Sequence, residues 1–293
     1  MDEGVNLLDE LYKKINSITK KELYQFMIDN SISLLNYHYN YFFQHCIQKN
    51  KIKIIGHHFS NHRIDGMTVI DDLGISFSYE VSNPIVKQNF TLCHELGHFI
   101  LRHEGSYFTE SVDCQDNYVE REANIFSALV LMPDIVLLSK IYYSCDAFQL
   151  VQDKLEVSKQ TLYFRLLDLF REYFPNSESE IIHSIKTYID GQNKSIRLLF
   201  QAIKESIIEE YNRYKPSLVN LIQQKIKLSG FVTSLDFPEL LNQESWLFLK
   251  KSNPNLKLWL VYNKGKSIAY AWDKNKLSEN EARKKAELQL LLM

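Results

Sequence analysis

Apolar residues recur at helical spacing near the start of the chain. Leu7, Leu8, Leu11 and Ile15 fall on one stripe of a helix. The aromatic run LLNYHYNYFFQHC follows. Such a run is more typical of a helix packed into a core than of a platform for stacking bases. The pattern therefore predicts a helical N-terminal segment over residues 1–50.

Short β-branched and alternating runs replace this pattern after residue 50. KIKIIGHH predicts one strand, and GMTVIDDLGISFSYEV predicts a hairpin over residues 67–81, because its apolar positions alternate on either side of Asp-Asp-Leu-Gly. Helical spacing returns in FTLCHELGHFILRH. A loop, HEGSYFTESVDCQDN, is expected next, followed by a helix, YVEREANIFSALVLM, that stops at Pro133. Residues 134–174 are expected to be helical too.

The break YFPNSESE is the best candidate for a domain boundary. Beyond it, residues 177 to about 228 are expected to form long helices. SWLFLKK, LKLWLVYN and SIAYAWDK predict three short strands. A last helix should open at Ser278, with Glu281 completing a capping box. The expected organisation is a helical segment at 1–50, a domain at 51–175 and a C-terminal α+β domain at 176–293.

Composition and charge exclude several classes of protein. The 293 residues are 45% hydrophobic with a net charge of −2, so no global field draws the chain to nucleic acid or to anionic membranes. The acidic start MDEGVNLLDELYKK differs from a secretory signal, and no apolar run approaches the roughly 18 residues of a membrane span. Four cysteines (Cys46, Cys93, Cys114 and Cys145) form no Cys-x-x-Cys pair. We expect a cytoplasmic protein with free thiols and with no membrane or direct nucleic-acid partner.

The pentad HELGH carries the candidate chemistry. His94 and His98 lie four residues apart, on one face of a helix, where both rings can bind one zinc ion. Glu95, directly after the first histidine, can act as a general base toward water. Gly97 costs roughly 1 kcal/mol of helix stability relative to Ala. A glycine at this position indicates that something approaches the helix closely.

A second helix offers the third ligand that a catalytic zinc requires. Glu120 and Asn124 are four residues apart and share a face with the small Ala123. We expect Glu120 to complete a His2Glu site and Asn124 to hydrogen-bond one of the ligand imidazoles. Glu122 remains the alternative ligand, although it points to a different face from Asn124.

Other residues carry weaker signals. His57, His58 and His62 form a cluster that we interpret as surface or loop histidines, and His103 is expected to cap the end of the HELGH helix. Tyr107, Tyr118 or a histidine could donate to an oxyanion, and the sequence does not choose among them. The run VSKQTLYFRLLDLF fits a helix-turn-helix recognition helix but lacks clustered basic residues, which favours a packing helix.

FTLCHELGHFILRH and EREANIFSALVLMP together resemble the ImmA/IrrE family of metallo-endopeptidases. LEVSKQTLYFRLLDL is similar to a further family segment, so the resemblance covers roughly residues 50–172. Cys93 and Ser127 stand where the family commonly has Ala. Residues 176–293 match no family that we can name.

The resemblance implies an α+β fold: a zincin-like peptidase domain with a small β-sheet, an HExxH helix and a second ligand helix. It implies Zn²⁺ as the cofactor, held by His94, His98 and Glu120, with Glu95 as general base. The substrate is expected to lie as an added strand along the edge of the 67–81 hairpin.

Proteins of this family typically act on a DNA-bound repressor or antitoxin encoded nearby. The resemblance therefore implies an endopeptidase that cuts a helix-turn-helix regulator at one site, in prophage, mobile-element or stress-response control. Residues 176–293 would recognise the substrate or receive a signal. The alternative is a catalytically silent regulator that keeps the site and acts by contact with protein or DNA. The intact Glu95 weighs against that alternative.

Overall fold

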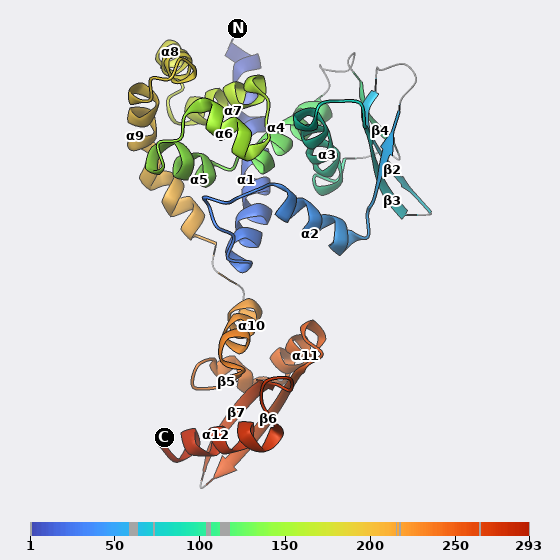
Figure 1. Cartoon of the computed structure of the whole chain (residues 1–293), viewed down its shortest axis with the longest axis vertical. Coiled ribbons are helices and arrows are strands. Elements are labelled where there is room, and N and C mark those ends of the chain that lie inside the picture. Colours follow the sequence, from blue (N-terminus) through green and yellow to red (C-terminus); the bar gives the residue numbers. More distant parts are fainter. Residues whose placement is uncertain are drawn as a thin grey trace. The chain divides into compact units, whose positions relative to one another are not determined.

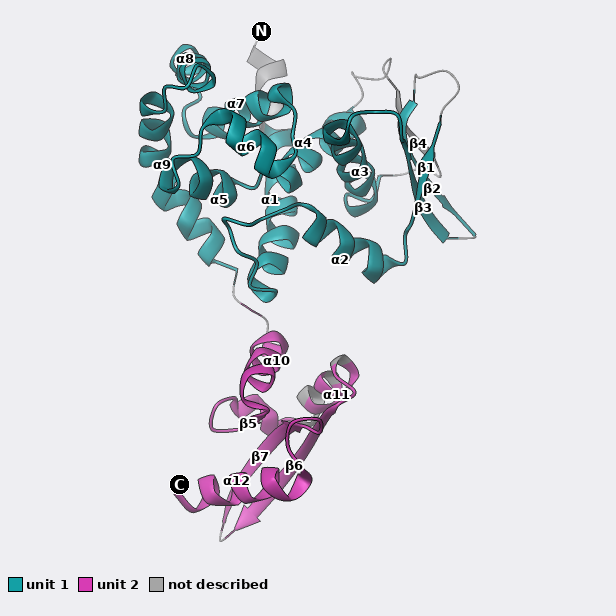
Figure 2. Ribbon diagram, viewed as in Figure 1, with its two compact units in different colours: residues 1–214 teal, residues 215–293 magenta. Residues whose placement is uncertain are grey.

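The computed structural model divides the chain into two compact units, residues 1–214 and 215–293 (Figures 1 and 2). The residues that the structure describes are 2–58, 64–72, 74–103, 107–111, 118–214, 216, 218–263 and 265–292. Cys114 and His62, which were named above, lie outside these ranges.

Helices make up most of the first unit. They are α1 (Asp2–Asp29), α2 (Asn40–Asn50), α3 (Ile85–Ile100), α4 (Tyr118–Leu131), α5 (Asp134–Leu137), the π-helix η1 (Leu138–Tyr143), α6 (Phe148–Leu155), α7 (Lys159–Tyr173), α8 (Glu178–Ile189) and α9 (Lys194–Asn212). The predicted helical N-terminal segment is confirmed as α1 and α2. Its aromatic run packs inward, because Tyr37, Phe42 and Phe43 are almost completely buried.

A four-stranded sheet completes this unit, with β1 (Lys53–His57), β2 (Ile64–Asp71), β3 (Gly74–Glu80) and β4 (Tyr107–Ser111) in the order β1-β3-β2-β4. The predicted hairpin is confirmed as β2 and β3, which pair antiparallel. β1 runs parallel to β3, and β4 runs antiparallel to β2. The prediction of a loop after α3 was wrong for Tyr107–Ser111, which form β4. Its sequence YFTES is short and mostly polar, so pairing with β2, rather than a hydrophobic pattern, defines it as a strand.

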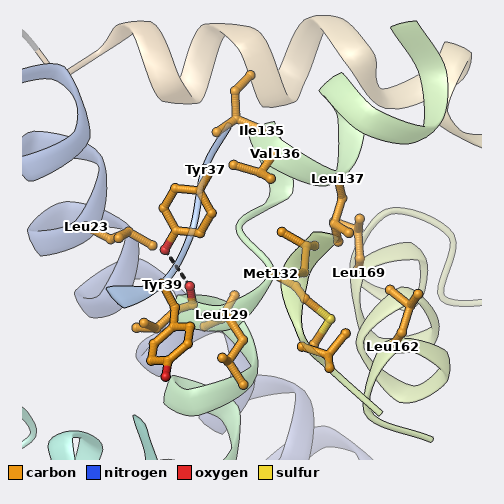
Figure 3. Packing of buried hydrophobic residues seen from close by; sticks show 14 of the residues in the cluster. Leu23, Tyr37, Tyr39, Leu129, Met132, Ile135, Val136, Leu137, Leu162 and Leu169 are labelled. Atoms are coloured by element: carbon orange, nitrogen blue, oxygen red, sulfur yellow. Dashed lines mark hydrogen bonds between the residues drawn. The ribbon is translucent and has the colours of Figure 1, made fainter. Parts of the chain in front are cut away.

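The hydrophobic core lies between α1, α4, α5 and α7. Leu23 of α1, Leu169 of α7 and Met132, directly after α4, belong to one buried cluster (Figure 3). The Tyr37 hydroxyl donates a hydrogen bond of 2.5 Å to the Val130 carbonyl, at the end of α4 (Figure 3). This core fixes α4, which carries Glu120 at its first turn.

One described stretch, Tyr118–Tyr143, is long and apolar enough to cross a membrane by length and composition. The expectation that no apolar run approaches such a length was therefore wrong. However, 78% of the apolar window is buried inside the protein. The stretch also contains Asp134, which is fully buried and paired with Lys20 and Arg165. Burial and ion pairing of this kind favour a core element.

The break near residue 175 separates α7 from α8 but does not end the first unit, which continues to residue 214. α8 packs against α7 and α9, and α9 also packs on η1. Ile181, Tyr188 and Phe200 are fully buried in the same core as Leu169. Sequence composition marks the turn at Pro175 clearly, whereas this packing depends on contacts distant in sequence.

The second unit contains α10 (Leu218–Ser229), β5 (Phe231–Thr233), the 3-10 helix η2 (Pro238–Leu241), α11 (Gln243–Ser252), β6 (Leu256–Asn263), β7 (Lys266–Asp273) and α12 (Glu279–Leu292). Its antiparallel sheet has the order β5-β7-β6. Alternate residues of β7 face two different clusters. Ala269 and Ala271 pack with residues of α10, and Tyr270 and Trp272 pack with residues of α12.

Two of the three strands predicted in this unit are confirmed, as β6 and β7. The third prediction was wrong, because SWLFLKK lies in α11. Trp246 and Leu249, three residues apart, contact the core together, which is helical spacing. The predicted capping box is confirmed: the Ser278 hydroxyl donates to a Glu281 carboxylate oxygen at 2.7 Å, and the Ser278 backbone N–H donates to the same oxygen at 2.9 Å.

Candidate metal centre

Gly97 lets the two helices of the site approach each other. A Cβ atom at this position would lie 3.1 Å from Phe126 Cδ1 and 3.2 Å from the Ala123 Cα of α4. Backbone atoms cannot move aside by rotating a bond, so a side chain here would press α3 and α4 apart by a few tenths of an ångström. The close approach inferred from the glycine is therefore an approach by α4, the helix that carries Glu120.

The structure brings His94, His98 and Glu120 together. One ligand atom from each lies within 4.8 Å of the others. His94 Nε2 is 2.9 Å from His98 Nε2 and 3.1 Å from Glu120 Oε2, and His98 Nε2 is 3.6 Å from Glu120 Oε1. Both histidines are buried, and 14% of the Glu120 side chain is exposed. We call these three residues the acceptor cluster.

Asn124 orients the first histidine. Its Oδ1 lies 2.9 Å from His94 Nδ1, the contact that the sequence predicted. An amide oxygen can only accept, so His94 Nδ1 carries the proton and donates it. In a neutral His94, Nε2 is then unprotonated, and its lone pair faces Glu120.

His103 orients the second histidine, a role that the sequence did not reveal. His103 Nδ1 is 2.9 Å from His98 Nδ1, and His103 Nε2 is 2.8 Å from Glu122 Oε2. Its backbone N–H does donate to the His98 carbonyl at 3.1 Å, as a residue ending a helix should, but its ring faces the His98 ring. Glu122, the alternative third ligand, instead holds His103 and pairs with Lys14 at 2.9 Å.

The residues fit a divalent metal ion. Glu122 can only accept, so His103 Nε2 carries a proton, and His103 Nδ1 is the atom that can accept from His98. His98 must then donate from Nδ1, which leaves its Nε2 as a lone pair. Burial, with His94 and His103 next, lowers the pKa of His98 to about 2, which keeps this ring neutral. The facing atoms of the acceptor cluster are thus two lone pairs and a carboxylate, a donor set suited to zinc.

Glu95 lies between α3 and the sheet and is fully buried. The Thr68 hydroxyl of β2 donates to Glu95 Oε2 at 2.5 Å. A Cβ at Gly66, on the same strand, would come within 2.6 Å of Glu95 Oε1 and 2.3 Å of Thr91 Cγ2. Neither Thr68 nor Gly66 was predicted, because nothing in their local sequence links them to α3.

The remaining candidates are not among the three residues that form the acceptor cluster. His58 Nδ1 is 3.4 Å from Glu80 Oε1, at the end of β1 and β3. Tyr118 begins α4 and is half exposed, and Tyr107 begins β4. Cys93 is fully buried, and burial raises the pKa of its thiol, which disfavours the thiolate that binds metal.

α7, the segment that fits a recognition helix, serves as a packing element. Leu162, Leu166 and Phe170 are fully buried, and Arg165 is buried in an ion pair with Asp134. Ser158 caps the helix by accepting from the Thr161 N–H at 3.0 Å.

A HExxH helix packed on a small mixed sheet, with a carboxylate supplied by the following long helix, is the arrangement of a zincin-like metallopeptidase. Residues 79–167 match the model of the IrrE N-terminal-like domain, a peptidase family. The match includes both α3 and α4, and it confirms the resemblance to the ImmA/IrrE family over this segment. No curated protein and no solved structure shows significant similarity to the chain.

Proposed function

We propose that the protein is a zinc-dependent endopeptidase. The observation that carries this proposal is the acceptor cluster, in which two imidazole lone pairs and a carboxylate converge within 4.8 Å. A metal cation among these atoms would give each of them a partner, which buried polar groups need. His94, His98 and Glu120 would hold the ion. Zinc bound in such a site lowers the pKa of a coordinated water to about 7 and polarises a carbonyl group.

Glu95 would act as the general base. Its carboxylate takes a proton from the attacking water and delivers it to the leaving amine. The short hydrogen bond from Thr68 holds one oxygen of this carboxylate, so the group has a fixed orientation. Glu95 directly follows the proposed ligand His94 on α3.

The expectation that the substrate binds along the hairpin edge needs correction. Both edges of the hairpin are already paired, β3 with β1 and β2 with β4. β4 forms one end of this sheet, and its partner β2 carries Thr68. We therefore place the substrate backbone along the outer edge of β4, where an extended peptide can add a strand.

The substrate would be a helix-turn-helix repressor or antitoxin, cut at one site in the cytoplasm. Support comes from the resemblance to the ImmA/IrrE family, whose members typically act on such regulators. Residues 215–293, a separate compact unit, would recognise the regulator or receive the signal that permits cutting. Control of a prophage, a mobile element or a stress response would be the biological setting.

Incubation of the purified protein with candidate helix-turn-helix regulators, followed by mass spectrometry, tests this function. We expect one cut, abolished by a chelator and restored by zinc. A zinc-loaded protein that cuts none of the regulators encoded nearby would contradict the proposal. If that protein instead binds a regulator and leaves it intact, the result would support the alternative of a catalytically silent regulator.

A further inference from the structure

A chain of contacts runs outward from the metal ligand His98. It passes from His98 Nδ1 to His103 Nδ1 over 2.9 Å and from His103 Nε2 to Glu122 Oε2 over 2.8 Å. Glu122 Oε1 then meets Lys14 Nζ at 2.9 Å. The chain joins α3, the residues just after it, α4 and α1.

Burial decides which of these contacts matter. The side chains of His103 and Glu122 are 6% and 13% exposed, whereas Lys14 is 62% exposed. Hydrogen bonds sheltered from water hold a geometry firmly, whereas exposed ion pairs contribute little. The contacts from His98 to Glu122 therefore hold the ring positions, whereas the exposed ion pair with Lys14 contributes little.

The two metal-ligand histidines are supported differently. His94 donates to the neutral amide of Asn124. His98 donates to an imidazole that is itself held by a carboxylate. Negative charge behind a ligand imidazole raises its basicity and fixes its tautomer and ring orientation. His98 receives this support through His103, whereas the His94 Nδ1 contact is with the neutral amide of Asn124.

Two simpler roles do not account for His103. A helix-capping role uses its backbone N–H, which bonds to the His98 carbonyl, and leaves the ring position unexplained. A role as a fourth ligand requires a ring lone pair directed at the acceptor cluster. Both ring nitrogens are engaged elsewhere, one with His98 and one with Glu122.

We propose that His103, oriented by Glu122, is a positioning residue for the metal ligand His98 and sets the affinity of the site for zinc. The proposal rests on the proposed function only in requiring that the site bind metal. Cleavage is not needed to test it.

The test measures the zinc Kd of the full chain by competition with a fluorescent zinc chelator of known affinity. We expect His103→Leu to weaken zinc binding by about 10- to 100-fold, the range found for outer partners of metal ligands. His103→Gln should lose less, because its amide oxygen can still accept from His98. His183→Leu, a change of an exposed histidine in α8, should leave the Kd unchanged.

A double variant separates this role from general damage. Because Glu122 acts through His103, His103→Leu combined with Glu122→Ala should bind zinc as weakly as His103→Leu alone. Additive losses would overturn the proposed order of contacts. A folded His103→Leu protein with the wild-type Kd would overturn the proposal itself.

The protonation of His98 gives a second measurement that needs no variant. In the metal-free wild-type protein, ¹⁵N NMR should show His98 protonated on Nδ1 and unprotonated on Nε2. The opposite tautomer would overturn the proposal even if His103→Leu fails to fold. Wild-type protein that takes up no zinc would contradict the proposed function as a whole, and that result is distinguishable from failure of the His103 role alone.

Discussion

The first unit buries two polar clusters that are built in opposite ways. In the ion cluster, Asp134 lies 2.6 Å from Lys20 and also pairs with Arg165, and Lys20 reaches Glu210 at 2.7 Å. In the acceptor cluster, two imidazole lone pairs and the Glu120 carboxylate face one another. Opposite charges complete the ion cluster within the chain. The acceptor cluster has the composition of a group that could hold a metal ion.

The difference shows that burial of polar groups does not by itself identify a functional site. A buried charge costs several kcal/mol unless it is paired, and the ion cluster meets that condition by joining α1, α5, α7 and α9. Its role is structural. Facing atoms that all accept, as in the acceptor cluster, indicate a ligand. The two clusters should therefore respond to different changes.

The largest effect is expected for Glu95, the proposed general base. Glu95→Gln should lower the cleavage rate by about 10²- to 10⁴-fold, because an amide cannot take the proton of water. Its zinc content, measured by elemental analysis, should stay at the wild-type level, whereas His98→Ala should lose zinc and cleavage together. Wild-type cleavage by Glu95→Gln would show that the general base is another group.

The ion cluster should affect stability without affecting zinc. Asp134→Ala leaves Lys20 and Arg165 without their shared partner and should cost about 3–5 kcal/mol of unfolding free energy. Urea denaturation measures this loss, with His183→Leu as the control. A stable Asp134→Ala protein that has lost its zinc would reverse the roles assigned to the two clusters.

Acid should act on the ion cluster in a predictable direction. Burial alone raises the pKa of Asp134, but Lys20 and Arg165 outweigh it and hold the pKa below its ordinary value. The unfolded chain therefore binds the proton first, so the stabilisation is present above the unfolded pKa of about 3.9 and is lost as pH falls below it. Asp134→Asn should flatten this part of the stability–pH curve. An unchanged curve would contradict the assignment.

Zinc should stabilise the protein through the acceptor cluster. At a free zinc concentration 100 times the Kd, binding adds about 2.7 kcal/mol to the unfolding free energy. The melting temperature of wild-type protein should rise with zinc and fall with a chelator. His98→Ala should show no such response, and Asp134→Asn should keep it. A zinc response that survives in His98→Ala would place the metal elsewhere.

The smallest effect is expected at Thr68. Thr68→Val removes the hydrogen bond to Glu95, and a bond to a charged group contributes about 1.5–3 kcal/mol. We expect a lower kcat with little change in KM, and recovery in Thr68→Ser, which keeps the hydroxyl. Equal losses in Thr68→Val and Thr68→Ser would indicate a packing role instead.

The acceptor cluster could be predicted because its parts obey helical spacing. His94 and His98 are four residues apart, as are Glu120 and Asn124, so each pair shares a face once the helix is recognised. The hairpin and the capping box of α12 were also predictable, since turn residues and caps are local signals. The sequence does not reveal which helices and strands contact each other. The roles of His103, Glu122 and Thr68 therefore became visible only in the structure.

The errors have a related cause. β4 is a strand because β2 lies beside it, and the first unit passes residue 175 because α8 and α9 pack back on earlier helices. α11 was mistaken for a strand because a short apolar run fits either period. Each of these features depends on a partner distant in sequence, which a local pattern does not contain.

The close spacing between α3 and α4 depends on the absence of a side chain at Gly97. Replacing its hydrogen with a methyl group would press on the backbone of Ala123, one turn along α4 from Glu120. Metal–ligand bonds tolerate deviations of only about 0.2 Å. The written motif His-Glu-x-x-His accepts any residue at this place, whereas the folded protein accepts almost none. A chain can therefore keep the written motif and still have its two site helices pushed apart by a single added carbon atom.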